Sequence, residues 1–552
     1  MLCHLYFAEK DNSVQASTER LDHLGLVAGV IKDLGLVELI DERIGTDPRE
    51  NISTGESIAG MILNGLGFSS KPLSLTPQFF KNKALSSLFR EEVKAEDFNA
   101  NKLSRSLDKV HKYGVEALFS ELSAKACAKE NIQTEYRSLD TTSISVTGEY
   151  DVDTDENTIK IKYGHSKDHR PDLKQLVHEL MVSQDGGVPL MMKSWDGNAS
   201  DNTIFKERTK YLVDSLKGSN WNGYLVADSK LYHSKNSEHL KLLSFITRIP
   251  GSLQEERKTI KEAIEKNSWI QLDESNKYFT RKLIHYDIEQ RWIVVHSKSA
   301  ESRAVKRVDK LIRREEEKIV KFKKQMKEAC FECETDAQAA FSEWAADLFY
   351  HAPHDFQMTK KAHFIGKGRR KKEATPDRYK IDIEFSFRLN EERKLEAISQ
   401  GSCYVVGSNA GEILSDIEVI KTYKKQNSSI ENMAFRFLKD PIFFVSSLFV
   451  KKPSRIETLL FIMTLSLLVY SIAQRKLRQA LKSCGETIPN QINNPTQTPT
   501  LRWIFQLLEG IDVIRVTIEG KVHKMISGLN ALSKKILLFF GESVCAIYEL
   551  TF

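Results

Sequence analysis

The chain has 552 residues, which is too long for one ordinary domain, and we expect roughly two to four domains. Apolar residues make up 41% of it and charged residues 28%, a balance that excludes a disordered or a fibrous protein. The net charge of +6 is compatible with a polyanionic partner but is too common to identify one.

Cysteine usage and the apolar runs argue against a secreted or a membrane protein. The seven cysteines are scattered, and only Cys330 and Cys333 form a C-x-x-C pair, so we expect reduced thiols and no zinc site. The first residues, MLCHLYFAEKDNS, lack the basic flank and the apolar core of a signal peptide. The most apolar run, Leu459–Ala473, is shorter than the roughly 20 residues that cross a bilayer, and it predicts a buried helix. We therefore expect a cytoplasmic protein without a membrane segment.

Residues 20–130 carry apolar side chains at helical spacing almost throughout. The run that starts at Leu21, LDHLGLVAGVIKDLGLVELIDERIG, predicts one helix that ends at Gly45. Further helices are predicted over Glu56–Leu66, Asn101–Tyr113 and Val115–Glu130. We therefore expect residues 1–132 to form a helical N-terminal domain.

The pattern changes after Gln133. The run TEYRSLDTTSISVTG is rich in β-branched residues and predicts a strand that ends near Gly148. The elements predicted after it are strands over Gln175–Ser183 and Val188–Trp195, a helix over Asp201–Leu216 and a short strand over Gly223–Ala227. This order predicts an α/β fold with a mixed sheet, of which residues 133–230 are the first part.

The rest of the chain divides into three segments. Residues 231–422 are interpreted as an insertion within the α/β fold, and they contain a long charged helix over Arg303–Ala329. Residues 423–482 complete the core with helices predicted over Ser429–Leu438 and Arg455–Ala480. Residues 483–552 are expected to form a helical tail.

Three acidic residues stand in settings that suggest metal-dependent chemistry. Asp140 lies inside a β-branched strand, where an acidic residue is otherwise disfavoured. Asp228 ends the apolar strand YLVAD, and site residues of α/β sheets gather at such carboxyl ends. Glu431 lies on the helix predicted from Ser429. Each alone is as compatible with a turn or a helix cap, but converging carboxylates are the ligands that Mg²⁺ prefers. Ser200 or Asp201 is expected to cap the helix over Asp201–Leu216, and a supporting role beside the site is the alternative for Asp201.

Four runs of the sequence resemble an insertion-sequence DDE transposase. They are GHSKDHRPDLKQL (Gly164–Leu176), DGNASD (Asp196–Asp201), VADSKLY (Val226–Tyr232) and FRFLKDPIFFVSSLFVKKPSRIE (Phe435–Glu457). The resemblance is to the group with a Tyr-Arg-Glu-Lys signature around its third carboxylate, and it extends from about Leu21 to Leu508. It implies a ribonuclease-H-like fold with an inserted domain, between a helical N-terminal domain and a helical C-terminal tail.

The resemblance implies catalytic and metal-binding roles for Asp140, Asp228 and Glu431, which would together hold two Mg²⁺ ions that Mn²⁺ can replace. Tyr423 and Lys439 match the signature tyrosine and lysine, which contact phosphates near the cleaved end in that family. Two features depart from the pattern. Gln426 stands where the arginine is expected, and the intervals on either side of Glu431 are each one residue longer than in the family.

The partner implied by the resemblance is double-stranded DNA, as transposon ends and as target, held by a homodimer in a synaptic complex at a prokaryotic nucleoid. A role of the N-terminal domain in binding the ends is plausible. The stretch KKAHFIGKGRRKK, from Lys360 to Lys372, predicts contacts with the DNA backbone, although a solvated loop explains it equally well. The residues expected to make these contacts are Lys367, Arg369, Arg370, Lys371 and Lys372.

The reaction implied is cleavage at the ends of an element, followed by transfer of the freed 3′-OH into target DNA. Two alternatives stay open. One is a nuclease of the same fold that cuts without joining, and the other is an inactive, transposase-derived DNA-binding protein. The three retained carboxylates argue against the inactive protein, whereas the altered spacing and the missing arginine argue for it.

Overall fold

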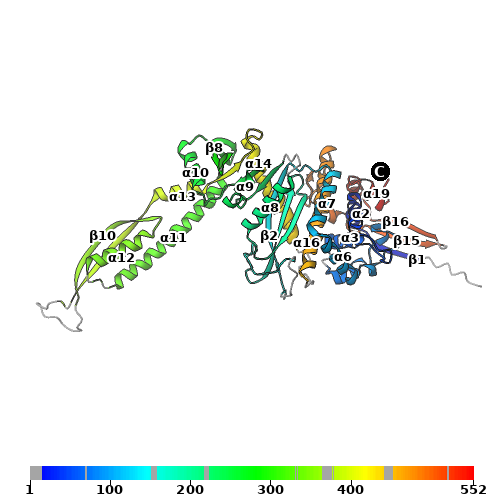
Figure 1. Ribbon diagram of the computed structural model, residues 1–552, viewed down its shortest axis with the longest axis horizontal. Coiled ribbons are helices and arrows are strands. Elements are labelled where there is room, and N and C mark those ends of the chain that lie inside the picture. Colours follow the sequence, from blue (N-terminus) through cyan, green and yellow to red (C-terminus); the bar gives the residue numbers. More distant parts are fainter. Residues whose placement is uncertain are drawn as a thin grey trace, which may run out of the picture. The chain divides into compact units, whose positions relative to one another are not determined.

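The computed structural model describes residues 15–68, 71–148, 150, 158–216, 223–329, 331, 333–363, 376, 378–440, 452–518 and 521–551. The chain divides into two compact units (Figure 1). Unit 1 comprises Met1–Thr247 and Lys421–Phe552, and unit 2 comprises Arg248–Ile420, which is coloured from green to yellow in the figure. All three carboxylates that the sequence singles out belong to unit 1.

Unit 1 begins with a helical part, as predicted. Its helices are α1 (Leu24–Leu34), α2 (Leu36–Ile44), α3 (Thr54–Leu66), α4 (Thr76–Phe80), α5 (Leu85–Leu88), α6 (Ala100–Tyr113) and α7 (Val115–Lys129), with the 3-10 turns η1 (Leu73–Leu75) and η2 (Ala95–Phe98). The single helix predicted over Leu21–Gly45 is wrong, because Gly35 adopts a left-handed conformation with φ at 65° and divides it into α1 and α2. α3 begins at a capping box between Ser53 and Glu56.

Five strands of unit 1 form a mixed sheet. They are β2 (Tyr136–Val146), β3 (Lys174–Ser183), β4 (Pro189–Trp195), β5 (Tyr224–Ala227) and β6 (Ser244–Arg248), in the order β4-β3-β2-β5-β6. β2, β3 and β4 are antiparallel neighbours, whereas β2, β5 and β6 run parallel. α8 (Asp201–Leu216) connects β4 to β5, and the short helices η3 (Ser234–Asn236) and α9 (Ser237–Leu240) precede β6. The predicted strands and the mixed sheet are confirmed.

The centre of this sheet is covered on both faces. Nine of the ten residues of β3 and all four residues of β5 are buried, with no alternation of buried and exposed positions. Strands that are buried on both faces consist of continuous apolar runs, as in the segment YLVA of β5. β5 itself is therefore shielded from solvent along its whole length. Asp228 is the first residue after its carboxyl end.

The last part of unit 1 returns to helices. They are α14 (Asp416–Gln426), of which the residues from Lys421 onward belong to unit 1, the π-helix η4 (Asn427–Phe435), α15 (Arg436–Lys439), α16 (Pro453–Ser483), α17 (Leu501–Leu507), α18 (Ala531–Leu538) and α19 (Glu542–Ile547). α14, which carries Tyr423, continues directly into η4, which carries Glu431. The region predicted as one helix over Ser429–Leu438 is a π-helix followed by a single α-helical turn.

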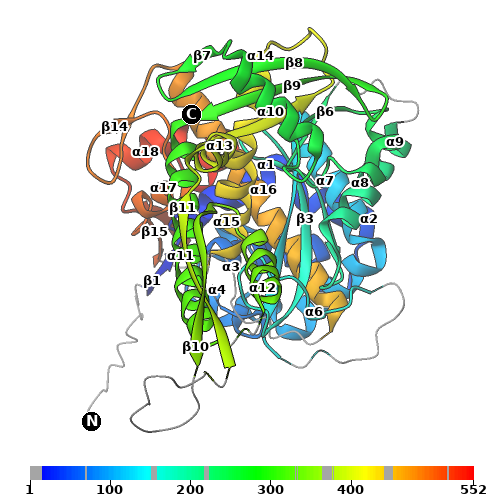
Figure 2. The same cartoon turned by 90° about the vertical axis from the view of Figure 1, so that its left-hand side faces the viewer.

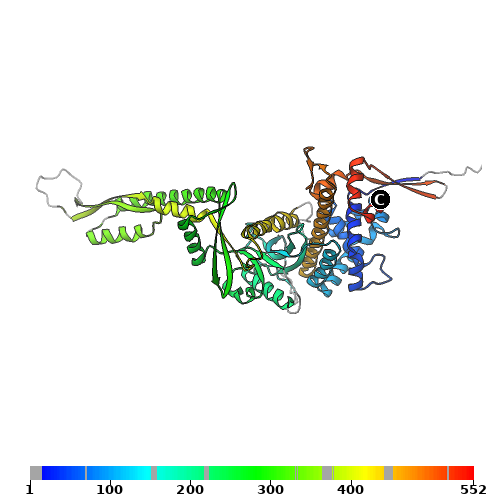
Figure 3. The ribbon, with the colours of Figure 1, turned by 90° about the horizontal axis from the view of Figure 1, so that it is seen from above.

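α16 is the central helix of unit 1. It packs against α3, α6, α7 and β4, and it also contacts α1 (Figures 2 and 3). Among the described residues it is the one helix long and apolar enough to cross a membrane, with a mean hydropathy of 2.0 over its most apolar window, but 83% of that window is buried inside the fold. The structure therefore confirms a buried helix over the run Leu459–Ala473.

The C-terminal tail is not wholly helical, which corrects the prediction. β15 (Asp512–Ile518) and β16 (Lys521–Ser527) form a hairpin, and β15 also pairs with β1 (Gln15–Arg20) from the other end of the chain. β13 (Ile488–Pro489) and β14 (Pro495–Thr496) form a second, minimal ribbon. The hydroxyl of Tyr548, buried in unit 1, donates a hydrogen bond to the carbonyl of Asp22, so the two ends of the chain are packed together.

Unit 2 has a sheet and a separate hairpin. Its elements are α10 (Gln254–Lys266), β7 (Ile270–Asp273), β8 (Asn276–His285), β9 (Ile288–Ser297), α11 (Lys298–Glu328), α12 (Glu334–Ala346), β10 (His351–His363), β11 (Arg378–Leu389), α13 (Glu391–Gly401) and β12 (Cys403–Ser408). β12, β9, β8 and β7 are antiparallel neighbours in that order. β10 and β11 pair only with each other, and α11 and α12 lie along them (Figure 1).

Unit 2 and the predicted insertion, residues 231–422, start at different points. The segment before β6 belongs to unit 1, because β6 pairs with β5 in register from Tyr224 and Ser244 onward. The assignment of residues 1–132, 133–230, 423–482 and 483–552 to separate domains stays a prediction.

Candidate active site

Asp140 and Asp228 are neighbours across two parallel strands. Leu139 on β2 is in register with Ala227 on β5, and each aspartate is the next residue of its strand or strand end. β5 ends at Ala227, while β2 continues to Val146, so the second half of β2 has no parallel neighbour beyond this point. Asp140 is 8% exposed. The two carboxylates predicted from strand position are therefore brought together at one edge of the sheet.

The two aspartates affect each other's ionisation. Burial raises the pKa of Asp140 well above its usual value, the carboxylates of Asp228 and Glu431 raise it further, and Lys167 opposes them. Burial is also the main cause of the raised pKa of Asp228, to which Asp201 adds. Buried carboxylates that repel one another are stabilised by a cation, which is the electrostatic setting of a metal site.

Glu431 reaches this region from η4. Its side chain lies on the exposed side of the π-helix, while Ile430 and Ala434 on the other side are buried. η4 packs against β2 and β3, and the Ser429 hydroxyl lies 3.4 Å from that of Ser138, two residues before Asp140. The helix of the third predicted ligand is therefore packed beside the first, with its carboxylate at the surface.

Serine side chains account for the wide turn of η4. The hydroxyls of Ser428 and Ser429 both donate to the carbonyl oxygen of Lys425, at 2.8 and 2.9 Å. Side chains that bond to carbonyls of the preceding turn compete with the backbone and distort a helix. The N–H of Arg436 accordingly bonds to the carbonyl of Glu431, five residues earlier, as in a π-helix.

A lysine that the sequence did not single out lies among the acidic residues. The ammonium of Lys167 donates to the carbonyl and the hydroxyl oxygens of Thr141, at 2.6 and 2.7 Å. It lies 3.9 Å from Asp140 Oδ1 and 3.6 Å from Asp201 Oδ1. Lys167 therefore provides positive charge at the point where the acidic side chains come together.

Asp201 contacts the same cluster, and of the two expected cap residues, Ser200 and Asp201, it is Ser200 that caps the helix. The Ser200 hydroxyl accepts from the N–H of Thr203 at 3.3 Å. The carboxylate of Asp201 accepts from the Thr141 hydroxyl at 2.8 Å. Thr141 thus connects Asp201 to the strand that carries Asp140.

Two glycines explain why the GHSKD and DGNASD runs belong together. A Cβ on Gly164 would lie 2.0 Å from the carbonyl oxygen of Gly197, and a Cβ on Gly197 would lie 1.9 Å from that of Gln175. The side-chain amide of Gln175 donates to the Gly197 carbonyl at 2.8 Å. This close backbone packing, possible only without side chains, fixes the loop that carries Lys167 against the start of α8.

The two signature residues have different surroundings. The ammonium of Lys439, at the end of α15, lies 2.5 Å from Asp168 Oδ1, so it contacts the loop of Lys167. Tyr423 lies on α14 and is partly buried. The structure brings Lys439 to the acidic region, where its charge is compensated by a carboxylate.

The basic stretch lies mostly outside the described residues. Those not described include Lys367, Arg369, Arg370, Lys371 and Lys372. Two lysines at its start are described on β10: Lys361 pairs with Asp382 at 2.5 Å, and Lys360 lies 4.7 Å from the ring centroid of Tyr379. The predicted DNA contacts of this stretch remain predictions.

The acidic residues fit a divalent metal by donor type, but they do not form a closed set. Within the described ranges, no group of three or more His, Cys, Asp or Glu side chains is close enough to hold a metal ion. Asp140 and Asp228 supply the hard oxygen donors that Mg²⁺ prefers. Each follows one of two residues, Leu139 and Ala227, that are paired across neighbouring strands. A third ligand would have to come from a side chain that turns toward them.

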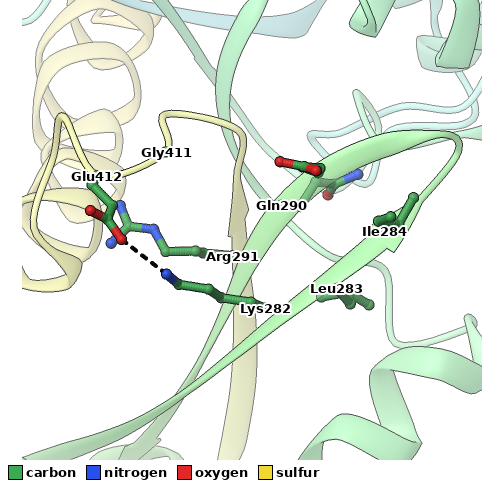
Figure 4. A pocket seen from close by; sticks show the side chains of 8 residues that line it. Lys282, Leu283, Ile284, Gln290, Arg291, Gly411 and Glu412 are labelled. Atoms are coloured by element: carbon green, nitrogen blue, oxygen red, sulfur yellow. Dashed lines mark hydrogen bonds and ion pairs between the residues drawn. The ribbon is translucent and has the colours of Figure 1, made fainter.

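A separate hollow in unit 2 contains none of the predicted site residues (Figure 4). It is lined by Lys282, Leu283, Ile284, Glu289, Gln290, Arg291, Gly411 and Glu412. Its charges are satisfied locally, because Lys282 pairs with Glu412 at 3.1 Å and Arg291 with Asp416 at 2.7 Å. Nothing in this lining indicates a particular ligand.

The sequence did not single out Lys167, and it left a place of Asp201 beside the other carboxylates as an alternative to a helix cap. The signal for both was their position within two runs whose glycines need close backbone contact, GHSKD and DGNASD. That contact pairs residues far apart in the chain, so neither run by itself indicated that Lys167 and Asp201 would meet.

Residues 16–124 match the model of a family described as a domain of unknown function, DUF4277. A search of curated protein sequences finds no match. Among solved structures, the chain is similar to a piggyBac transposase in a cryo-EM synaptic complex with hairpin DNA, at 8% identity and a TM-score of 0.37, over 90% of this chain and 82% of that one. A superposition of that quality does not establish a shared fold.

Proposed function

We propose that the chain is a DNA transposase that cleaves the ends of an element and transfers the freed 3′-OH into target DNA. The observation that carries this proposal is the pairing of Asp140 and Asp228 at the end of β5, within electrostatic reach of Glu431. The four runs that resemble insertion-sequence DDE transposases include or flank these residues. The proposal includes a ribonuclease-H-like fold for the part of the chain that contains this sheet.

The proposed cofactor is a pair of Mg²⁺ ions, which Mn²⁺ can replace. When bound, such ions activate the attacking oxygen and stabilise the leaving oxygen at a phosphodiester. Asp140 and Asp228 would hold them from the sheet, and Glu431 would complete the ligand set by turning inward from η4. Glu431 is exposed, so its side chain is not fixed by packing.

Lys439 is the proposed phosphate contact. Its ammonium is held by Asp168 in the protein alone, at 2.5 Å. A DNA phosphate that approaches the site can replace this carboxylate, since a lysine binds phosphate as a compact point charge. Tyr423 and the basic stretch after Lys360 are further proposed DNA contacts, and a homodimer would hold two ends together in the synaptic complex.

The proposal is tested with labelled end DNA, a target plasmid and Mg²⁺ or Mn²⁺. Asp228→Asn removes a charged ligand and is expected to lower cleavage at least about 100-fold, because the metals lose a charged oxygen. The matched control is Asp172→Asn, whose carboxylate is exposed and pairs with Arg170 at 2.7 Å, away from the cluster. The readout is the rate of strand cleavage and the yield of joined product on a sequencing gel.

The same assay separates the alternatives. Joined product in the unmodified protein supports a transposase, whereas cleavage without joining indicates a nuclease of the same fold. Binding of end DNA without cleavage in either metal indicates an inactive, transposase-derived binding protein. Cleavage by Asp228→Asn at the unmodified rate contradicts the assigned site.

A further inference from the structure

Lys167 is placed by several contacts rather than left free in solvent. Its backbone N–H donates to the Ser143 hydroxyl at 2.8 Å, and the next residue, Asp168, is held by Lys439. Its ammonium is bonded to two oxygens of Thr141, and 33% of its side chain is exposed. The loop that supplies it is locked by the packing of Gly164 against Gly197. The ammonium is therefore a fixed part of the acidic region.

The charges around this ammonium are unbalanced. Asp140 and Asp201 lie within 4.0 Å of it, and Asp228 follows the strand next to that of Asp140. Lys167 lowers the pKa of both Asp140 and Asp228, against the effect of burial. One lysine thus lies near several carboxylates and partly compensates their charge. It makes no direct hydrogen bond to Asp140, because the separation of 3.9 Å between Nζ and Oδ1 is too long for one.

We propose that Lys167 is the resident cation of this site in the metal-free protein, and that its ammonium competes with a divalent metal ion for Asp140. This inference rests on the proposed function, in which Asp140 and Asp228 hold the metal. A metal ion bound to Asp140 brings two positive charges close to the ammonium. Their repulsion in a partly buried site weakens metal binding, so Lys167 keeps the affinity low until the ion and the DNA phosphates arrive together.

The test is a titration of the full-length protein with Mn²⁺ alone at pH 8, followed by calorimetry and by the Mn²⁺ EPR signal. Lys167→Gln retains a donor for Thr141 but removes the charge, and it is expected to bind Mn²⁺ about tenfold more tightly. Lys167→Arg retains the charge and is expected to bind as the unmodified protein does. Lys162→Met, at an exposed lysine on the same segment, makes the same change in net charge outside the site.

A second readout is independent of affinity. Without metal, Lys167→Gln is expected to unfold at a lower temperature than the unmodified protein, because the carboxylates lose their cation, and saturating Mn²⁺ is expected to narrow this difference. If the glutamine variant folds poorly, Lys167→Met serves as a second neutral variant under the same conditions.

The outcomes distinguish this inference from the proposed function. One result overturns the competition and leaves the metal site in place. In it, Mn²⁺ binds the unmodified protein, binding is lost in Asp140→Asn, and Lys167→Gln binds Mn²⁺ with the same or a lower affinity than the unmodified protein. If Mn²⁺ binds none of these proteins, the metal site and the competition are overturned together. The competition is also overturned if Lys162→Met raises the affinity for Mn²⁺ as much as Lys167→Gln does, since the net charge alone would then explain the effect.

Discussion

Asp140 is held in the fold at an energetic cost. Its carboxylate is buried, and its pKa is raised by burial and by the neighbouring carboxylates of Asp228 and Glu431. A group whose folded-state pKa lies above its unfolded value binds protons more strongly in the folded state, so stability falls as pH rises above the ordinary value of 3.8. The buried carboxylate of Asp140 therefore lowers the stability of the metal-free protein at neutral pH.

Asp140→Asn is therefore expected to stabilise the metal-free protein, with no gain near pH 4 and a gain of roughly 2–4 °C in unfolding temperature near pH 8. The measurement is thermal unfolding in a chelating buffer across that pH range. Asp172→Asn is the control, because Arg170 lowers the pKa of that exposed carboxyl and the sign of its pH dependence is opposite. A constant difference between Asp140→Asn and the unmodified protein at all pH values would contradict this account.

At the scale of elements, the π-helix η4 and the turn between β3 and β4 position Glu431. Gly187 in that turn has φ at 67°, and a Cβ there would lie 2.7 Å from the sulfur of Met433 and 3.1 Å from the carbonyl of Ser429. The side-chain amide of Gln184, in the same turn, donates to the carbonyl of Thr422 at 2.9 Å. The turn therefore lies close against η4 at Gly187 and is bonded through Gln184 to α14, the helix that leads into η4.

Gly187→Ala is expected to displace η4 and to lower DNA cleavage about tenfold, since small displacements of catalytic groups are costly. Gly411→Ala is the matched control, because Gly411 also has a positive φ, 59°, but nothing lies within 4 Å of an added Cβ. Both changes carry a backbone strain of about 1 kcal/mol, and only the first touches η4. Faster hydrogen exchange over residues 427–435 in Gly187→Ala alone supports this role, and equal exchange in both variants rules it out.

At the scale of the whole molecule, two buried histidines make unit 1 sensitive to acid. His178 on β3 is fully buried against Thr464 of α16 and Ser194, and burial lowers its pKa to about 3. His23, which bonds to the carbonyl of Leu66 at 2.9 Å, has its pKa lowered to about 4 by burial. Both pKa values lie below the unfolded value of 6.5, so both residues favour unfolding as pH falls below 6.5.

The two histidines are expected to lower the stability of unit 1 from pH 6.5 toward pH 4 by about 1.4 kcal/mol per pH unit each, against the opposite contribution of Asp140 and Asp228, whose pKa is raised. Urea unfolding of the full chain at several pH values measures this slope. His178→Gln retains polar groups for its two hydroxyl partners and is expected to reduce the slope. His165→Gln, at an exposed histidine, is expected to leave the slope unchanged. An unaltered slope in His178→Gln would mean that other groups cause the acid sensitivity.

The local features of this protein could be predicted from its sequence. Apolar periodicity located most helices, a β-branched run located β2, short apolar stretches between turn residues located β3 to β5, and strand position singled out Asp140 and Asp228. These features depend on neighbours within a few residues, whose spacing decides which face is buried. The sequence predicts the position of the helix over Ser429–Leu438 but not that it is a π-helix. The serine hydroxyls that widen this helix bond to backbone carbonyls, and the 3.6-residue apolar pattern does not show such bonds.

Only the tertiary structure decided how distant segments meet. β1 pairs with β15 across nearly the whole chain, which made part of the expected helical tail a sheet. Lys167 and Asp201 join the carboxylates because Gly164 packs on Gly197, a contact that no local pattern encodes. Such contacts are set by the packing of the complete fold, where the burial of apolar surface outweighs local preference.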